Sequence, residues 1–197
     1  MRTAWGYDIE GQTLEPLLSV EQFNTMTGNA YSGNARVEPA LKAASQAIRN
    51  FCGWHICPLL RCDAYPAGGG KVIKLPASYV SEIVSVHEEG VELGSGQYEW
   101  RHEGLLRRCC FRNWSGKWDA VQVVYRAGFD IAAVPDLAET IRAITESVIT
   151  VSAGVMSESA DGVSISYSAS ASSIAAALTA QQKNALEIYK VVSSHGA

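Results

Sequence analysis

The sequence predicts an α+β protein: an antiparallel helical bundle with an inserted antiparallel β-unit between two long helices. In two segments, near residues 37–51 and 137–151, apolar residues recur every three or four positions, as on one face of a helix. Residues 59–129 between them alternate with a period of two, as strands do. Because both helices carry an apolar stripe, we expect the two stripes to pack on each other.

The first long helix is predicted to begin near Arg36 and to run to about Cys52. Pro39 has no backbone donor and fits within the first turn, and Gly53 can adopt the left-handed conformation that ends a helix. Its stripe consists of Val37, Leu41, Ala44, Ile48 and Phe51. Pro135 and Gly154 bound the second long helix in the same way.

Two shorter helices are indicated by capping boxes. Ser19 with Gln22 predicts a helix over residues 20–27, and Thr179 with Gln182 predicts the last helix of the chain.

The β-unit is predicted to consist of short strands joined by hairpins. Glu89-Gly90 and the segment Gly94-Ser95-Gly96 are turn sequences that lie between alternating runs, so neighbouring strands are expected to be antiparallel. The expected strands are residues 72–75, 80–86, 91–93, 98–101, 105–108 and 120–126.

We therefore expect three parts: an extended N-terminal arm (1–18), a helical core (19–58 and 130–197), and an inserted β-rich subdomain (59–129). Serine and alanine crowd residues 155–177, which contain one weak alternating strand. Our hypothesis is that Gly162 to Ser168 completes a sheet, either with the protomer's own hairpin or with a neighbouring subunit.

Composition narrows the classes of function. The chain has 197 residues, 47% of them apolar, and a net charge of −4, which argues against a surface that grips nucleic-acid phosphates. The N-terminal residues lack the apolar core of a signal peptide, so we expect a soluble protein made in a host cytoplasm. An odd number of cysteines, five, favours free thiols over a disulfide framework.

No arrangement typical of catalysis is found, so we expect no enzyme activity, no cofactor and no metal. Gly68-Gly69-Gly70-Lys71 lacks the Ser or Thr of a phosphate-binding loop, and a glycine turn before a strand is the better interpretation. Cys52, His55, Cys57 and Cys62 gather potential zinc ligands, but their spacing matches no usual zinc motif.

One basic, aromatic stretch allows two interpretations. Interleaved arginines and tryptophans can stack on nucleic-acid bases, but they are also the usual anchors of protein interfaces, and nearby acidic residues favour the second reading. The stretch comprises Trp100, Arg101, Arg107, Arg108, Phe111, Arg112, Trp114, Lys117 and Trp118.

Six segments follow one another along the chain: LLSVEQFNTMTG, ALKAASQAIRNFCGWHICP, a β-rich middle ending VVYRAGF, VPDLAETIRAITESVI, SESADGVSISYS and TAQQKNALEIYK. Their order resembles the head-tail connector family of tailed bacteriophages, the small adaptor or head completion proteins. The resemblance covers nearly the whole chain, and the serine-rich segment after the second long helix is the most distinctive match. The middle segment is longer than in the smallest family members.

The resemblance implies a structural virion protein that forms a ring, typically twelve-fold, beneath the portal. One face would dock on the portal protein, the other would receive head-closure or tail-terminator proteins, and DNA would pass through the channel during genome packaging and ejection. Candidate subunit or portal contacts are Trp5, Trp114, Trp118, Val163, Ile165, Tyr167, Leu186 and Tyr189. The alternative is a small metal- or nucleic-acid-binding accessory protein of phage or prophage origin.

Overall fold

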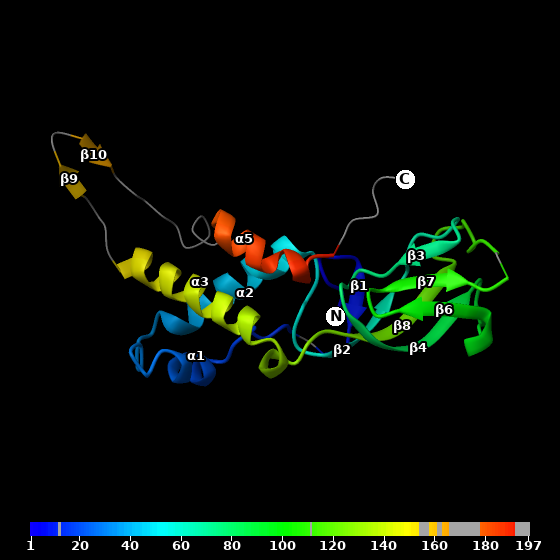
Figure 1. The fold of residues 1–197 in the computed structure, drawn as a ribbon, viewed down its shortest axis with the longest axis horizontal. Helices are drawn as coiled ribbons and strands as arrows, with labels where there is room; N and C mark the ends of the chain where they lie inside the picture. Colours follow the sequence, from blue (N-terminus) through cyan, green and yellow to red (C-terminus); the bar gives the residue numbers. More distant parts are fainter. Residues whose placement is uncertain (12, 111, 154–157, 161–162, 166–177, 192–197) are drawn as a thin grey trace. The chain divides into compact units, whose positions relative to one another are not determined.

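The computed structural model describes residues 1–11, 13–110, 112–153, 158–160, 163–165 and 178–191 (Figure 1). The chain divides into two compact units. The sheet unit comprises Met1–Leu14, Cys52–Asp130 and Tyr189–Ala197, and the helical unit comprises Glu15–Phe51 and Ile131–Ile188. The three-part division expected from the sequence stays a prediction.

The predicted helical bundle with an inserted β-unit is wrong. The fold is a sheet-rich α+β fold, and its sheet unit holds two antiparallel sheets, one of five strands and one of three. Periodicity identified most helices and strands correctly, but it did not show which of them pair or pack with one another. The larger sheet also takes a strand from the N-terminal residues, and it holds a core of its own around Tyr7, Cys62 and Tyr125, which are all buried. The β-rich segment is therefore a principal core of the protein.

The larger sheet has the strand order β1-β2-β8-β4-β5. Its strands are β1 (Tyr7–Ile9), β2 (Leu60–Ala64), β8 (Val121–Ala127), β4 (Val80–Glu88) and β5 (Val91–Glu92). The central strand β8 is rich in valine, which suits a pleated, buried surface. Residues 7–9, expected in an extended arm, form the edge strand β1, where Tyr7 lies opposite Ala64.

The smaller sheet has the order β3-β7-β6 and is made of β3 (Val72–Lys74), β7 (Leu105–Arg108) and β6 (Tyr98–Arg101). The short 3₁₀ helix η1 (Ser95–Gln97) precedes β6. Ile73 and Leu106 are paired across β3 and β7 and are buried, so this face of the sheet forms its core. Alternation along each strand then places the neighbouring residues on the outer face.

The helical unit contains α1 (Val20–Met26), α2 (Val37–Cys52) except its last residue, α3 (Pro135–Ala153) and α5 (Ala180–Leu186). It also contains the 3₁₀ helix η2 (Ile131–Ala133) and the first two residues of η3 (Glu187–Tyr189). The capping boxes at Ser19 and Thr179 are present. Among these helices, α3 and α5 approach each other closely along their backbones. The stripes are buried: Leu41 and Ile48 in α2 and Leu137 and Ile141 in α3 are fully buried.

Two short strands lie in the serine-rich segment. β9 (Glu158–Ala160) pairs with β10 (Val163–Ile165) in an antiparallel hairpin. The weak strand predicted around residue 165 is thus present, and its partner is a strand that the sequence analysis did not anticipate. The rest of the segment predicted to pair, residues 162 and 166–168, lies outside the described residues.

Candidate interaction surface

The loop between β7 and β8, called here the Trp118 loop (residues 112–120), is anchored by a buried ion pair at its base. Arg108, at the end of β7, forms an ion pair of 2.9 Å with Glu88, at the end of β4, and the two side chains are only 7% and 14% exposed. The Arg108 guanidinium also lies 5.5 Å from the ring centre of Trp114. This cation–π contact fixes Trp114 at the start of the loop.

Two adjacent carboxylates hold the middle of the Trp118 loop. The Ser115 N–H donates to Glu88 at 2.7 Å, and the Ser115 hydroxyl donates to Glu89 at 2.7 Å. Lys117 donates to the other oxygen of Glu89 at 2.9 Å. The hydrogen bond from Ser115, followed by Lys117, lowers the pKa of Glu89, so the carboxylate is ionised at neutral pH. The loop is therefore held on both sides of Gly116.

The glycine run Gly68-Gly69-Gly70 allows a second backbone segment to pack against the loop. Trp114 N–H donates to the Gly70 carbonyl at 2.8 Å, and Gly69 N–H donates to the Trp114 carbonyl at 3.1 Å. A Cβ atom on Gly68 would lie 1.9 Å from the Ser115 carbonyl oxygen, a distance that no side chain tolerates. This close approach requires glycine at position 68, and the φ of 92° at Gly69 also favours glycine.

The loop presents one tryptophan to solvent and buries the other. Trp114 is 2% exposed, whereas Trp118 is 97% exposed. Asp119 next to it has a φ of 52°, a left-handed conformation, and the Glu89 N–H donates to the carbonyl of Ala120 at 2.7 Å. A large aromatic side chain is thus held outside the core by a loop whose backbone is fixed at several points.

An apolar groove lies in the helical unit, beside α1. It has a volume of about 340 Å³, and its lining comes from α1 and the residue before its cap, from η2 and from the first turn of α3. The apolar members are Leu18, Met26, Ile131, Ala132 and Ala138. Glu21, Gln22 and Thr25 form its polar border, so its charged lining residue is an acid. We call it the α1 groove.

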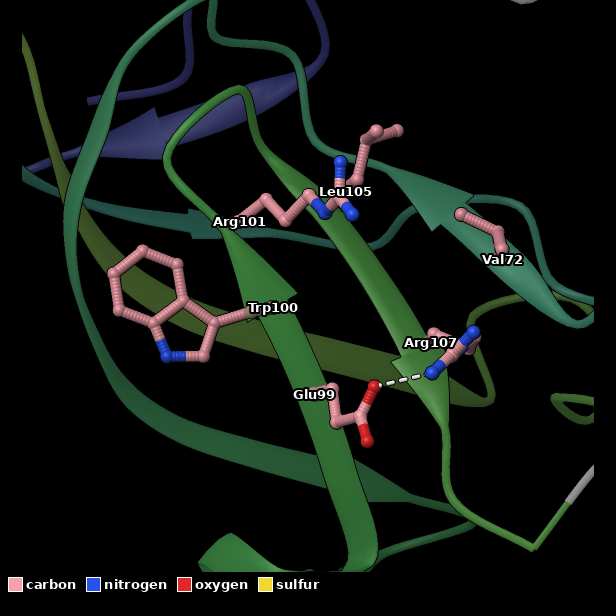
Figure 2. A pocket seen from close by; sticks show the side chains of 6 residues that line it. All are labelled: Val72, Glu99, Trp100, Arg101, Leu105 and Arg107. Carbon is pink, nitrogen blue, oxygen red and sulfur yellow. Dashed lines mark hydrogen bonds and ion pairs between the residues drawn. The ribbon is translucent and has the colours of Figure 1, made fainter.

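The outer face of the smaller sheet forms a third surface (Figure 2). The β-sheet register places Val72, Arg107 and Glu99 side by side in one row across the three strands. Arg107 and Glu99 form an exposed ion pair of 2.5 Å within this row. Trp100 lies between Glu99 and Arg101 in β6, so its side chain leaves the strand on the opposite side from theirs. Figure 2 shows its ring on the other side of β6 from Leu105. The groove on this face has a volume of about 270 Å³.

The structure places the predicted contact residues in different environments. Trp118 is fully exposed and Trp5 is half-buried, whereas Trp114, Leu186 and Tyr189 are buried within the protomer and serve its own core. Tyr189 packs edge-on to Phe129, and its carbonyl accepts a hydrogen bond of 2.6 Å from the Trp54 indole. Val163 and Ile165 lie in β10, and Tyr167 lies outside the described residues.

The basic aromatic stretch does not form one continuous surface. Arg107, Arg108 and Lys117 each pair with a different glutamate, and Arg108 and Trp114 are buried. Phe111 lies outside the described residues. Three of its cations are thus paired with carboxylates and one of its rings is buried, which leaves a smaller part of the stretch for nucleic-acid phosphates and bases. The interface interpretation of Trp118 stays a prediction.

The predicted cysteine and histidine cluster is part of the core. The two ring nitrogens of buried His55 lie 2.9 Å from the Tyr7 hydroxyl and 3.0 Å from the Ala127 carbonyl oxygen. Burial raises the pKa of the Cys62 thiol to about 12. Within the described ranges there is no group of three or more histidine, cysteine or acidic residues placed to hold a metal ion.

Sequence reasoning missed the Glu88 and Glu89 clamp and the α1 groove. The sequence predicted a turn at Glu89-Gly90, and both residues have positive φ, but the contacts of the Glu88 and Glu89 carboxylates with the Trp118 loop were not predicted. The groove has no sequence signal, because its residues come from segments more than a hundred positions apart. No described helix is long and apolar enough to cross a membrane.

Comparison with known proteins identifies the fold. No family model matches the sequence, and no curated protein is found to match it. Among solved structures, a chain from the neck of an empty GTA (gene transfer agent) particle, computed with C6 symmetry, is similar with a TM-score of 0.58 at 16% identity. A chain from the neck of a native GTA particle, computed with C12 symmetry, is similar with a TM-score of 0.59 at 15% identity.

The chain shares the fold of these neck proteins. In both comparisons the similarity covers 96% of this chain and 98% of the other. The similarity therefore extends over both compact units.

Proposed function

We propose that this protein is a structural neck component of a phage-like particle, a head-tail connector rather than an enzyme. The observation that carries the proposal is the end-to-end similarity to chains of GTA necks, over 96% of this chain. The order of sequence segments resembles head-tail connectors independently of this comparison.

In this proposal the chain assembles into a ring, with twelve copies as the expected number. The similar chains belong to particles computed with C6 and C12 symmetry, which supports rotational assembly. A ring closed by rotation needs two different complementary surfaces on each protomer. The exposed Trp118 and the α1 groove are two such unlike surfaces.

The ring would join the portal protein to a head-closure or tail-terminator protein and would let DNA pass through its channel. A chain with a net charge of −4 is suited to let DNA slide, because a strongly basic lining would hold the phosphates. In the assembled particle the protein would lie at the head-tail interface of the virion.

The test is to mix the purified protein with purified portal rings of the same particle and to image the product by electron microscopy. We expect a second ring stacked on the portal, with the symmetry of the protomers visible in averaged end views. The protein alone and the portal alone are the controls. A bare portal at all concentrations, together with stoichiometric zinc or a shifted DNA band, would favour a metal- or nucleic-acid-binding accessory protein instead.

A further inference from the structure

We propose that Trp118 of one protomer inserts into the α1 groove of a neighbouring copy of this chain and that this contact closes the ring. The inference rests on the proposed ring function and specifies the pair of surfaces that forms it. Two apolar surfaces of the protomer are exposed to water, which is unfavourable. The indole of Trp118 is 97% exposed, and in the α1 groove Met26 is 39% exposed.

The loop is built to present the indole, since its backbone is already ordered before any partner binds. Ser115 and Lys117 are held by Glu88 and Glu89, and Trp114 is paired with the glycine run. Association usually costs conformational entropy when a loop must be ordered, and this loop has little left to lose. An exposed tryptophan on a fixed loop therefore has the properties of an interface anchor.

The groove matches the indole in size and chemistry. Its volume of about 340 Å³ is near the lower end of the roughly 300–1,000 Å³ that ligand pockets span, so it suits a single bicyclic side chain. Leu18, Ile131 and Ala138 supply apolar contacts. The groove and the tryptophan belong to different compact units, so the contact joins two unlike surfaces and can repeat head to tail around a ring.

Charge complementarity favours a second copy of this chain as the occupant. Lys117 precedes Trp118, and Glu21 is the charged residue at the border of the groove. Lys117 is paired with Glu89 on an exposed surface, and its ammonium group has two further N–H donors, so it can bind a second carboxylate while it still holds the loop. Trp118 in the groove would bring Lys117 towards Glu21 of the neighbour.

Photo-crosslinking identifies the occupant directly. The photoreactive residue p-benzoylphenylalanine replaces Trp118, and an equal mixture of ¹⁵N-labelled and unlabelled protein is irradiated, alone over a concentration series and with portal rings. We expect mixed-isotope crosslinks from position 118 to residues 18–26 or 131–138. The same photoreactive residue at Val91, which is 65% exposed in the same unit, is the control and should not reach these segments.

A matched pair of substitutions on α1 provides an independent readout. Met26 lines the groove and Val20 does not, yet their exposed fractions are 39% and 40%. Met26→Lys places a cation where Lys117 of the neighbour would approach, and Trp118→Ala removes the anchoring side chain. Each variant should raise the concentration needed for ring assembly about tenfold or more. Val20→Lys should leave it unchanged. Circular dichroism establishes that each variant is folded.

The outcomes separate this inference from the proposed function. Rings that form normally with Trp118→Ala, or crosslinks that map elsewhere, would overturn the Trp118 contact and leave the connector function intact. If no ring forms under any condition, with or without portal rings, both the proposed function and the Trp118 contact are contradicted. Crosslinks to the groove, with assembly lost in Met26→Lys and kept in Val20→Lys, would establish the contact.

Discussion

Arg108 and Glu88 form an ion pair of 2.9 Å between β7 and β4, with side chains only 7% and 14% exposed. Glu88 also accepts the Ser115 N–H, so one carboxylate joins two strands to the Trp118 loop. The pair thus connects the core of the sheet unit to the surface that we propose as an interface.

Arg108→Ala should destabilise the protein by about 3–5 kcal/mol, because it leaves the buried Glu88 carboxylate without its partner. Chemical denaturation gives the free energy of unfolding. The neighbouring Arg107→Ala breaks an exposed pair with Glu99 and should cost less than about 1 kcal/mol. Equal losses in the two variants would show that burial of the pair contributes nothing.

Gly68→Ala should destabilise the protein by at least about 1–3 kcal/mol, since the new Cβ would collide with the Ser115 carbonyl oxygen. The thermal midpoint of unfolding measures this loss. Gly96→Ala is the matched control, because a Cβ at that position meets nothing within 4 Å. If both alanine variants melt like the original protein, the glycine run does not pack against the loop.

Tyr7→Phe should cost about 1–3 kcal/mol, because the Tyr7 hydroxyl accepts the buried His55 N–H at 3.0 Å and bonds to its ring nitrogen. Urea unfolding followed by tryptophan fluorescence is a suitable measurement, and Tyr65→Phe, at an exposed position, is the control. A stable Tyr7→Phe variant would mean that β1 is held by its backbone alone.

The stability of the protein should fall as the pH rises from about 9 to 12. Burial raises the pKa of the Cys62 thiol to about 12 and that of Tyr125 well above its usual value. Between the unfolded and folded pKa values only the unfolded thiol has lost its proton, so alkali favours unfolding by up to about 1.4 kcal/mol per pH unit.

Cys62→Ala removes this thiol. Whatever its effect on absolute stability, it should reduce the slope of the unfolding free energy against pH by the contribution of one proton, about 1.4 kcal/mol per pH unit. Unfolding in urea at pH 9, 10 and 11 supplies the comparison. The substitution Cys110→Ala, at an exposed cysteine, should leave the slope unchanged. An unaltered slope in Cys62→Ala would contradict the raised pKa.

Trp118→Ala should leave the free energy of unfolding of the isolated protein within about 0.5 kcal/mol, because its side chain contacts almost nothing in the protomer. Any loss of assembly in this variant is then a loss of contact between copies. A large drop in stability would show that Trp118 packs within its own chain.

Local patterns in the sequence predicted the elements well, whereas the fold class depended on distant partners. The capping boxes at Ser19 and Thr179 and the stripes of α2 and α3 are present, because each depends on residues a few positions apart. β1 has only three residues, too few for a period to be visible, and its partner β2 lies more than fifty positions away. The bundle was predicted because the sheets' own core could not be seen from periodicity.

The candidate site likewise depends on residues that are far apart in the sequence. Composition predicted both Trp114 and Trp118 as interface anchors, and for Trp118 this stays a prediction. Composition could not distinguish the buried Trp114, which packs against Arg108, from the exposed Trp118. The α1 groove combines residues near 20 with residues near 135, so only the folded chain reveals it.

The central position of β8 has a consequence for how the protein is synthesised. β2 and β4 both pair with β8, which is the last strand of the larger sheet to leave the ribosome. Until residue 127 has emerged, both nascent strands expose unpaired edges of the kind that join neighbouring chains. A cell that makes many copies at once therefore has its highest risk of aggregation in the first two thirds of translation, and fragments that stop before β8 should collect in inclusion bodies.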